Sequence, residues 1–276
     1  MAISDISLTA GMRSNLVSLQ GTVDLLNRTQ ERLASGKRVN SPLDNATNYF
    51  VAKSHMDRAG DLSVRKDGMG EAIQTVKAAN EGITAITDLI ASAKGIAQSA
   101  LSAGTTEAAT LATQFNAILD QIDFVAADSG YKGTNLLSAT AAERTLTVKF
   151  DESGDSSLTI TGSNATTSAA GLNIADAANN WATSTDINTA ITALDGALTN
   201  LRTSAKTLSS NLNIITTRDA FTQSMINVLS EGATNLTAAD TNEEGANMLM
   251  LQVRQSLGTT ALSLSAQAAQ SVLRLF

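Results

Sequence analysis

Apolar residues recur every seven positions along most of this chain. From Leu194, a track counted in sevens reaches Leu264 and is aliphatic at nine of its eleven positions. A repeat of this length places one apolar stripe along a helix and is typical of coiled-coil seams. The pattern therefore predicts long helices that pack lengthwise. Two earlier tracks have the same form: Met12, Leu19, Leu26 and Leu33, and then Leu62, Met69, Val76, Ile83 and Ile90.

A fourth, shorter helix is predicted between two segments rich in glycine, serine and threonine. These segments are Ser102 to Thr106 and Ser129 to Gly133, and such clusters usually interrupt helices. Pro42 is the only proline, so the long stretches lack the strongest helix breaker. We expect the helices to pack as an antiparallel assembly. The apolar spacing of the short helix is carried by Leu111, Phe115, Ile118, Ile122 and Val125.

The end of the first helix and the start of the second have recognisable signals. Gly36 can adopt the left-handed conformation that closes a helix. Ser41 is a good N-cap, Pro42 suits the first helical position, and Asp44 supplies an acid three residues after the cap. The sequence therefore predicts a turn around Gly36 and a second helix that starts at Pro42.

The segment between residues 145 and 185 differs from the rest. Residues 145–150 and 157–161 alternate polar and apolar side chains, with turn-forming residues between them, which predicts a β-hairpin. Residues 162–185 are mostly serine, threonine, asparagine, alanine and glycine, with Trp181 as the only tryptophan. We expect this stretch to be a short surface-exposed insertion or a small lobe.

Both chain ends are strongly apolar. Residues 246–276 contain two arginines, no lysine and no acidic residue. Chain ends are normally solvated, so an apolar end indicates burial against another segment or another copy of the chain. We therefore expect the ends to be interaction surfaces.

Composition excludes several classes of function. The formal net charge of -7 argues against a nucleic-acid surface, and the absence of cysteine excludes disulfides and thiolate metal sites. His55 is the only histidine, so we expect it to be a solvated helix position rather than a catalytic base or metal ligand. Gly68-Met69-Gly70 lacks the context of a phosphate-binding loop. No cofactor, metal or catalytic residue is predicted, and no apolar run is long enough to insert into a membrane.

Three short motifs closely resemble those of bacterial flagellins. The first is residues 30–46, QERLASGKRVNSPLDNA, which contains Gly36, Asn40, Ser41, Pro42 and Asp44. The second is GYKGTNLL at residues 130–137, and the third is the tail QAAQSVLRL at residues 267–275. The resemblance covers roughly residues 1–150 and 186–276.

The resemblance implies a structural protein of nested layers. Residues 1–40 and 237–276 would be terminal helices that form the inner core of a tubular filament and fold on polymerisation. Residues 41–150 and 186–236 would form a helical rod that carries the hairpin near 145–161, and residues 162–185 would face outward. We expect the polymerisation contacts of the inner core to come from Leu16, Leu19, Val23, Leu26, Leu33, Met250, Val253, Leu257, Leu264 and Leu273.

The resemblance also implies partners and a location. The chain would associate with itself into a helical homopolymer that serves motility, and would meet an export chaperone, a filament cap and hook-associated junction proteins. Residues 1–10 lack the features of a secretory signal, so we expect export through the flagellar type III secretion channel to the outside of the cell.

Several alternatives remain open at this stage. The chain could be a hook-filament junction protein of the same family, or a cytoplasmic helical bundle that acts in signalling or as a scaffold. Asn242 to Glu244 interrupt the last heptad track, either as a solvent-facing or hinge turn or as polar residues that fix helix register in the filament. Serines and threonines in residues 153–185 are either O-glycan acceptors, by the resemblance, or parts of a solvated loop.

Overall fold

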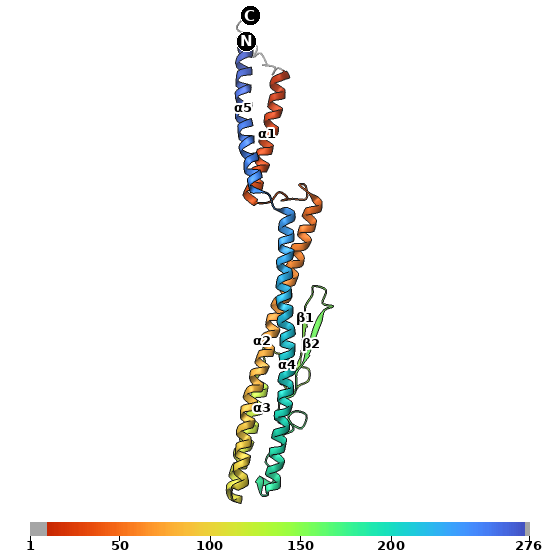
Figure 1. Ribbon diagram of the computed structural model, residues 1–276, viewed down its shortest axis with the longest axis vertical. Coiled ribbons are helices and arrows are strands. Elements are labelled where there is room, and N and C mark those ends of the chain that lie inside the picture. Colours follow the sequence, from red (N-terminus) through yellow and green to blue (C-terminus); the bar gives the residue numbers. More distant parts are fainter. Residues whose placement is uncertain (1–9, 274–276) are drawn as a thin grey trace, which may run out of the picture. The chain divides into compact units, whose positions relative to one another are not determined.

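The computed structural model describes residues 10–273 and consists of long helices with one small β-hairpin (Figure 1). This confirms the predicted fold class. The chain divides into a terminal unit, Met1–Asp57 with Val228–Phe276, and a central unit, Arg58–Asn227. Helices α2 and α4 contribute to both units. The elements are α1 (Ala10–Ser35), α2 (Ala46–Ser102), α3 (Thr105–Asp128), β1 (Thr145–Lys149), β2 (Ser157–Thr161), a 3-10 turn η1 (Ala178–Trp181), α4 (Ser184–Thr237) and α5 (Thr241–Leu273).

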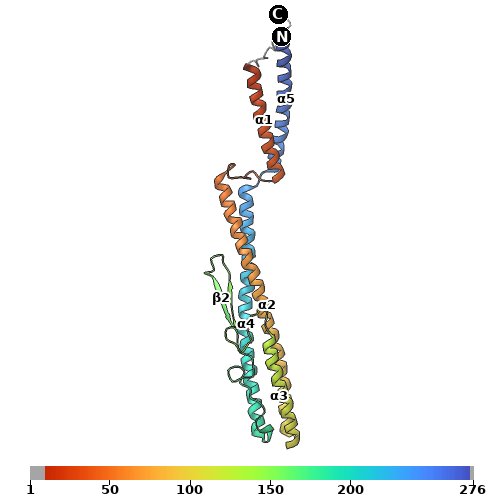
Figure 2. The ribbon, with the colours of Figure 1, turned by 180° about the vertical axis from the view of Figure 1, so that it is seen from behind.

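The central unit has a core made mainly from α2, α3 and α4, which lie side by side in both views (Figures 1 and 2). The heptad tracks read from the sequence supply this core, as predicted. Phe115 of α3 packs against Trp181, with ring centroids 4.8 Å apart. The members of the tracks on α2 and α4 that belong to this core cluster are Met69, Val76, Ile83, Ile90, Leu194, Leu201, Leu208 and Ile215.

The β-hairpin forms where the alternation predicted it. Strands β1 and β2 are antiparallel, and their register runs from Thr145 opposite Thr161 to Lys149 opposite Ser157. Val148 and Ile160 point into the core of the central unit, which fixes the register because a slip by one residue would expose them.

Residues 162–185 are not simply a surface insertion, so that expectation is wrong for part of the segment. Four apolar side chains in it are buried in the core of the central unit, and Trp181 is only 1% exposed. The segment is held to α3 because Asp123 accepts hydrogen bonds from the backbone N–H and the hydroxyl of Thr167. The polar composition hid these anchors, which are Ala165, Leu172, Ile174 and Trp181.

The second long helix begins at Ala46, so the predicted start at Pro42 is wrong by four residues. Asn45 is the residue that caps it, because its side-chain Oδ1 accepts the backbone N–H of Asn48 at 3.0 Å. Ser41 is not the N-cap. It lies in a turn in which its backbone carbonyl accepts the N–H of Asp44.

The break between the last two helices lies at residues 238–240, ahead of the predicted interruption at Asn242 to Glu244. Asp240 caps α5 by accepting the backbone N–H groups of Asn242 and Glu243. Asn242 to Glu244 therefore form the first turn of α5 and not a hinge. An acid placed in a first helical turn complements the helix dipole.

Candidate functional site

Helices α1 and α5 form an antiparallel pair in the terminal unit (Figure 1). Backbone hydrogen bonds join the segments next to them, from Arg38 N to the Thr237 carbonyl at 2.8 Å and from Ala239 N to the Gly36 carbonyl at 2.9 Å. Further along the pair, a Cβ added to Gly258 would lie 2.4 Å from Cδ1 of Leu19. The glycine therefore lets the leucine approach the α5 backbone closely.

The residues of α5 that face α1 define a regular seam, here called the inner face of α5. These residues are buried or half-buried and follow one another at alternating steps of four and three, which is the spacing of a coiled-coil seam. Leu251 is 5% exposed and is the best-buried apolar side chain of this seam. The inner face consists of Glu244, Met248, Leu251, Gln255, Gly258, Leu262 and Ser265.

The structure separates the predicted polymerisation residues into two groups. The predicted residues of α1 lie at its contact with α5: Leu26 is buried, and the other four, Leu16, Leu19, Val23 and Leu33, are half-buried. The predicted residues of α5 lie on the opposite side, away from α1, and are exposed: Met250 at 45%, Val253 at 59%, Leu257 at 64% and Leu264 at 61%. The side chain of Leu273 lies outside the described residues.

These four exposed residues of α5 form a second apolar stripe, here called the outer face of α5. They are spaced by three, four and seven positions, so they share one side of the helix. The heptad track that is buried in α4 as far as Leu229 thus becomes exposed after the break at residues 238–240. Apolar side chains in such a row are typical of an interaction surface.

Sequence reasoning missed the inner face because it followed a single track through both helices. The burial of Leu251 and Glu244 shows that the contact with α1 uses another track, one residue further along the helix. Only Met248, Leu251 and Leu262 of the inner face are large and apolar, so the sequence carries little signal of this seam. The outer track is the more apolar of the two, so hydrophobicity alone selects the track that α1 leaves uncovered.

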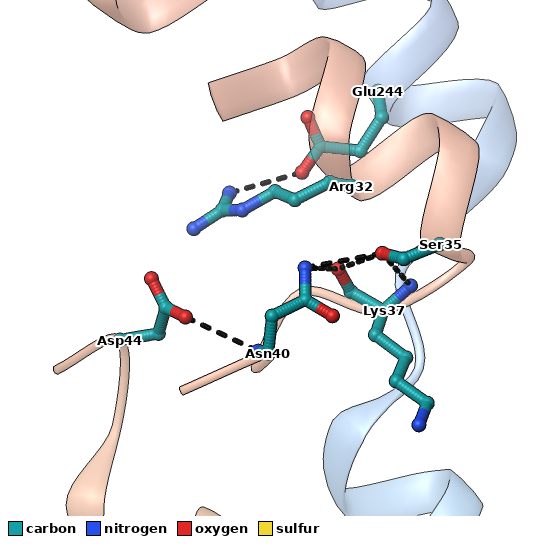
Figure 3. A network of polar contacts seen from close by, with 6 residues as sticks. All are labelled: Arg32, Ser35, Lys37, Asn40, Asp44 and Glu244. Atoms are coloured by element: carbon teal, nitrogen blue, oxygen red, sulfur yellow. Dashed lines mark hydrogen bonds and ion pairs between the residues drawn. The ribbon is translucent and has the colours of Figure 1, made fainter. Parts of the chain in front are cut away.

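A network of polar contacts orders the turn that follows α1 (Figure 3). Gly36 has a φ of 68°, as the predicted helix-closing role requires. Asn40 Nδ2 donates to Ser35 Oγ at 3.1 Å and to the Lys37 carbonyl at 3.4 Å. Asp44 Oδ2 accepts the backbone N–H groups of Asn40 and Ser41, at 3.1 and 3.0 Å. Pro42 is exposed within the same turn.

The same network lowers one pKa. Hydrogen bonds from the backbone N–H of Ser41 and then of Asn40 hold the pKa of the Asp44 carboxyl below its ordinary value. A lowered pKa in the folded state stabilises the turn at pH values above the ordinary aspartate pKa. This contribution is lost as the pH falls through the lowered one.

We therefore expect the backbone amide resonances of Asn40 and Ser41 to shift together in an acid titration, with a midpoint below the ordinary aspartate pKa. The physical reason is that protonated Asp44 is a weaker acceptor for both N–H groups. The measurement is an amide NMR titration of the soluble chain, with Asp44→Asn as the control that removes the transition. A midpoint at or above the ordinary value would contradict the network.

An ion pair connects α1 and α5. Arg32 Nη1 of α1 lies 3.0 Å from Glu244 Oε1 of α5, and Glu244 is 8% exposed (Figure 3). Over residues 10–273, no cluster of three or more potential metal-ligating side chains occurs, and no helix has the length and apolar character needed to cross a bilayer.

Sequence comparisons with known proteins agree on one family. The family described as "Bacterial flagellin N-terminal helical region" matches residues 3–142. Flagellin FljM of Caulobacter vibrioides is 28% identical over 278 residues, which cover 100% of both chains. A flagellin of Brucella melitensis is 28% identical over 267 residues, or 95% of both chains. A crystal structure of Bacillus cereus flagellin, at 17% identity and a TM-score of 0.47, covers 56% of this chain and 88% of that one.

Proposed function

This chain belongs to the bacterial flagellin family, and from that premise we propose that it polymerises through its terminal helices. It is a structural subunit of the flagellar filament, the propeller of swimming motility. In the proposal, α1 and α5 form the inner core of the filament. The inner face of α5 packs on α1 of the same chain, and its outer face packs on neighbouring copies.

The exposure of the outer face of α5 is the observation that carries this proposal. Burying one large aliphatic side chain contributes about 1.5–3 kcal/mol, so a row of four provides a substantial driving force for association. In a filament, each copy uses a surface that differs from the one it meets on its neighbour, which gives open, non-closing growth. An apolar stripe that α1 leaves uncovered fits this requirement.

The assignment of residues to layers follows from the same proposal. Residues 1–40 and 237–276 form the inner core, and residues 41–150 and 186–236 form the rod around it. Residues 162–185 face outward through their polar positions, while their buried apolar residues attach them to the rod. The polymerisation residues are the predicted leucines, valines and methionine of α1 and α5.

The proposal includes a route and partners beyond the homopolymer. The chain leaves the cell through the flagellar type III secretion channel and functions outside it. An export chaperone covers the apolar C-terminal segment before export, and a filament cap and hook-associated junction proteins contact the polymer at its ends. The chain acts by assembly alone and has no catalytic step.

Deletion of residues 241–276 tests the proposal. The shortened chain is expected to stay soluble at concentrations at which the full chain forms filaments, because the outer face of α5 is gone. Sedimentation and electron microscopy measure assembly, and circular dichroism verifies that the central unit is still helical. Normal filaments from the shortened chain would refute the proposal.

A further inference from the structure

The α1 side of the contact between α1 and α5 is apolar and repetitive. On α1 the track Met12, Leu19, Leu26 and Leu33 repeats every seven residues. A shift of one heptad would place leucine where leucine was before on α1, so the α1 side of the contact alone specifies the register weakly. The native register must therefore be distinguished by features of α5, among them Gly258, which accommodates Leu19, and Glu244, which pairs with Arg32.

Arg32 and Glu244 provide the one ion pair between α1 and α5 in the part of the chain that the structure describes. Their side chains are 30% and 10% exposed, so the pair is largely removed from water. The Nε of Arg32 is buried without a hydrogen-bond partner, which indicates that the guanidinium is not stabilised by other acceptors at that atom. The carboxylate of Glu244 is thus its principal partner.

A shift of one heptad would separate these charges. The residue seven positions before Arg32 is Leu25, and the residue seven positions after Glu244 is Leu251. A shift in one direction would bring Leu25 to Glu244, and a shift in the opposite direction would bring Leu251 to Arg32, so either shift separates the two charges. A buried carboxylate without a cationic partner is strongly destabilising, so the shifted pairing would be penalised at this one layer.

We propose that the Arg32–Glu244 pair is the residue pair that determines the register of α1 against α5. The inference rests on the proposed role of these helices in the filament core, where many similar apolar helices compete as neighbours. Replacing a buried ion pair by apolar residues often leaves stability unchanged, whereas a polar pair in an apolar seam selects one register. Arg32 and Glu244 are therefore positioning residues.

Disulfide trapping in assembled filaments tests the proposal, because the natural chain has no cysteine. Leu19→Cys with Gly258→Cys reports the native register, since these positions are in close contact. Leu26→Cys with Gly258→Cys reports a register shifted by one heptad. With the ion pair present, we expect the native disulfide to exceed the shifted one by about tenfold or more, as one polar layer suffices to specify register.

The decisive variant is Arg32→Met with Glu244→Met, combined in turn with each of the two cysteine pairs. Without the ion pair, the native and the shifted disulfide are expected to form to a similar extent. The matched control is Arg28→Met with Glu243→Met, which removes the same charges from exposed positions of the same helices and should keep the native disulfide dominant. The exchanged pair, Arg32→Glu with Glu244→Arg, should restore a single register. Mass spectrometry of the oxidised filaments identifies each disulfide.

Three results would overturn the inference. These are a dominant native disulfide in the double methionine variant, loss of both disulfides in it, and mixed registers in the exchanged pair. Failure of the proposed function is read separately. If the chain assembles into filaments without residues 241–276, the proposed function is wrong, whatever the disulfide pattern.

Discussion

Leu257→Asp combined with Leu264→Asp is expected to abolish filament growth. Both leucines are more than 60% exposed on the outer face of α5, so the soluble chain can accommodate aspartate at either position. In the filament these positions become buried, and two leucine contacts of about 1.5–3 kcal/mol each are lost while two carboxylates lose water. The critical concentration for assembly should rise by about a thousandfold or more.

Sedimentation of seeded polymerisation reactions measures this critical concentration. The matched control is Gln252→Asp with Ser256→Asp, which adds the same charge at exposed polar positions of the same helix. The control should assemble far better than the leucine variant. An unchanged critical concentration for the leucine variant would show that the outer face does not mediate assembly.

Phe115→Ala is expected to destabilise the central unit severely. Phe115 is fully buried in α3 and packs against Trp181, and its removal would leave a cavity between α3 and the 3-10 turn. Truncation of a buried phenylalanine usually lowers the free energy of unfolding by about 3–5 kcal/mol. Urea unfolding monitored by circular dichroism and by the fluorescence of the single tryptophan measures the change.

Phe124→Ala is the appropriate control, because Phe124 belongs to the same helix and is 59% exposed. Its removal should alter the free energy of unfolding by less than about 0.5 kcal/mol, as is usual for surface positions. Equal losses for the two variants would contradict the core described for the central unit.

The regular parts of the fold could be predicted from sequence because their periodicity is strong. The heptad tracks located the long helices, and the alternation in residues 145–161 located the hairpin. The start of α2 was missed because Ser41, Asp44 and Asn45 can all act as caps. In the structure Asp44 binds the backbone of the turn, which leaves Asn45 to cap the helix.

The candidate site could be predicted only in part. The sequence indicates that α5 is apolar, but its most apolar track is not the one that α1 covers, and only the position of α1 decides which track is buried. Likewise, Glu243 and Glu244 are adjacent and chemically alike, yet only Glu244 is buried against Arg32. Residues 162–185 contribute isolated anchors without any period, and such anchors become visible only in the folded chain.

Side-chain footprinting of α5 tests the central claim most directly. Hydroxyl radicals should label Val253, Leu257 and Leu264 in the soluble chain, where these side chains are exposed. In filaments the account predicts that labelling of all three falls to background, since neighbouring copies cover the outer face. Equal labelling of these residues in filaments and in the soluble chain would contradict it.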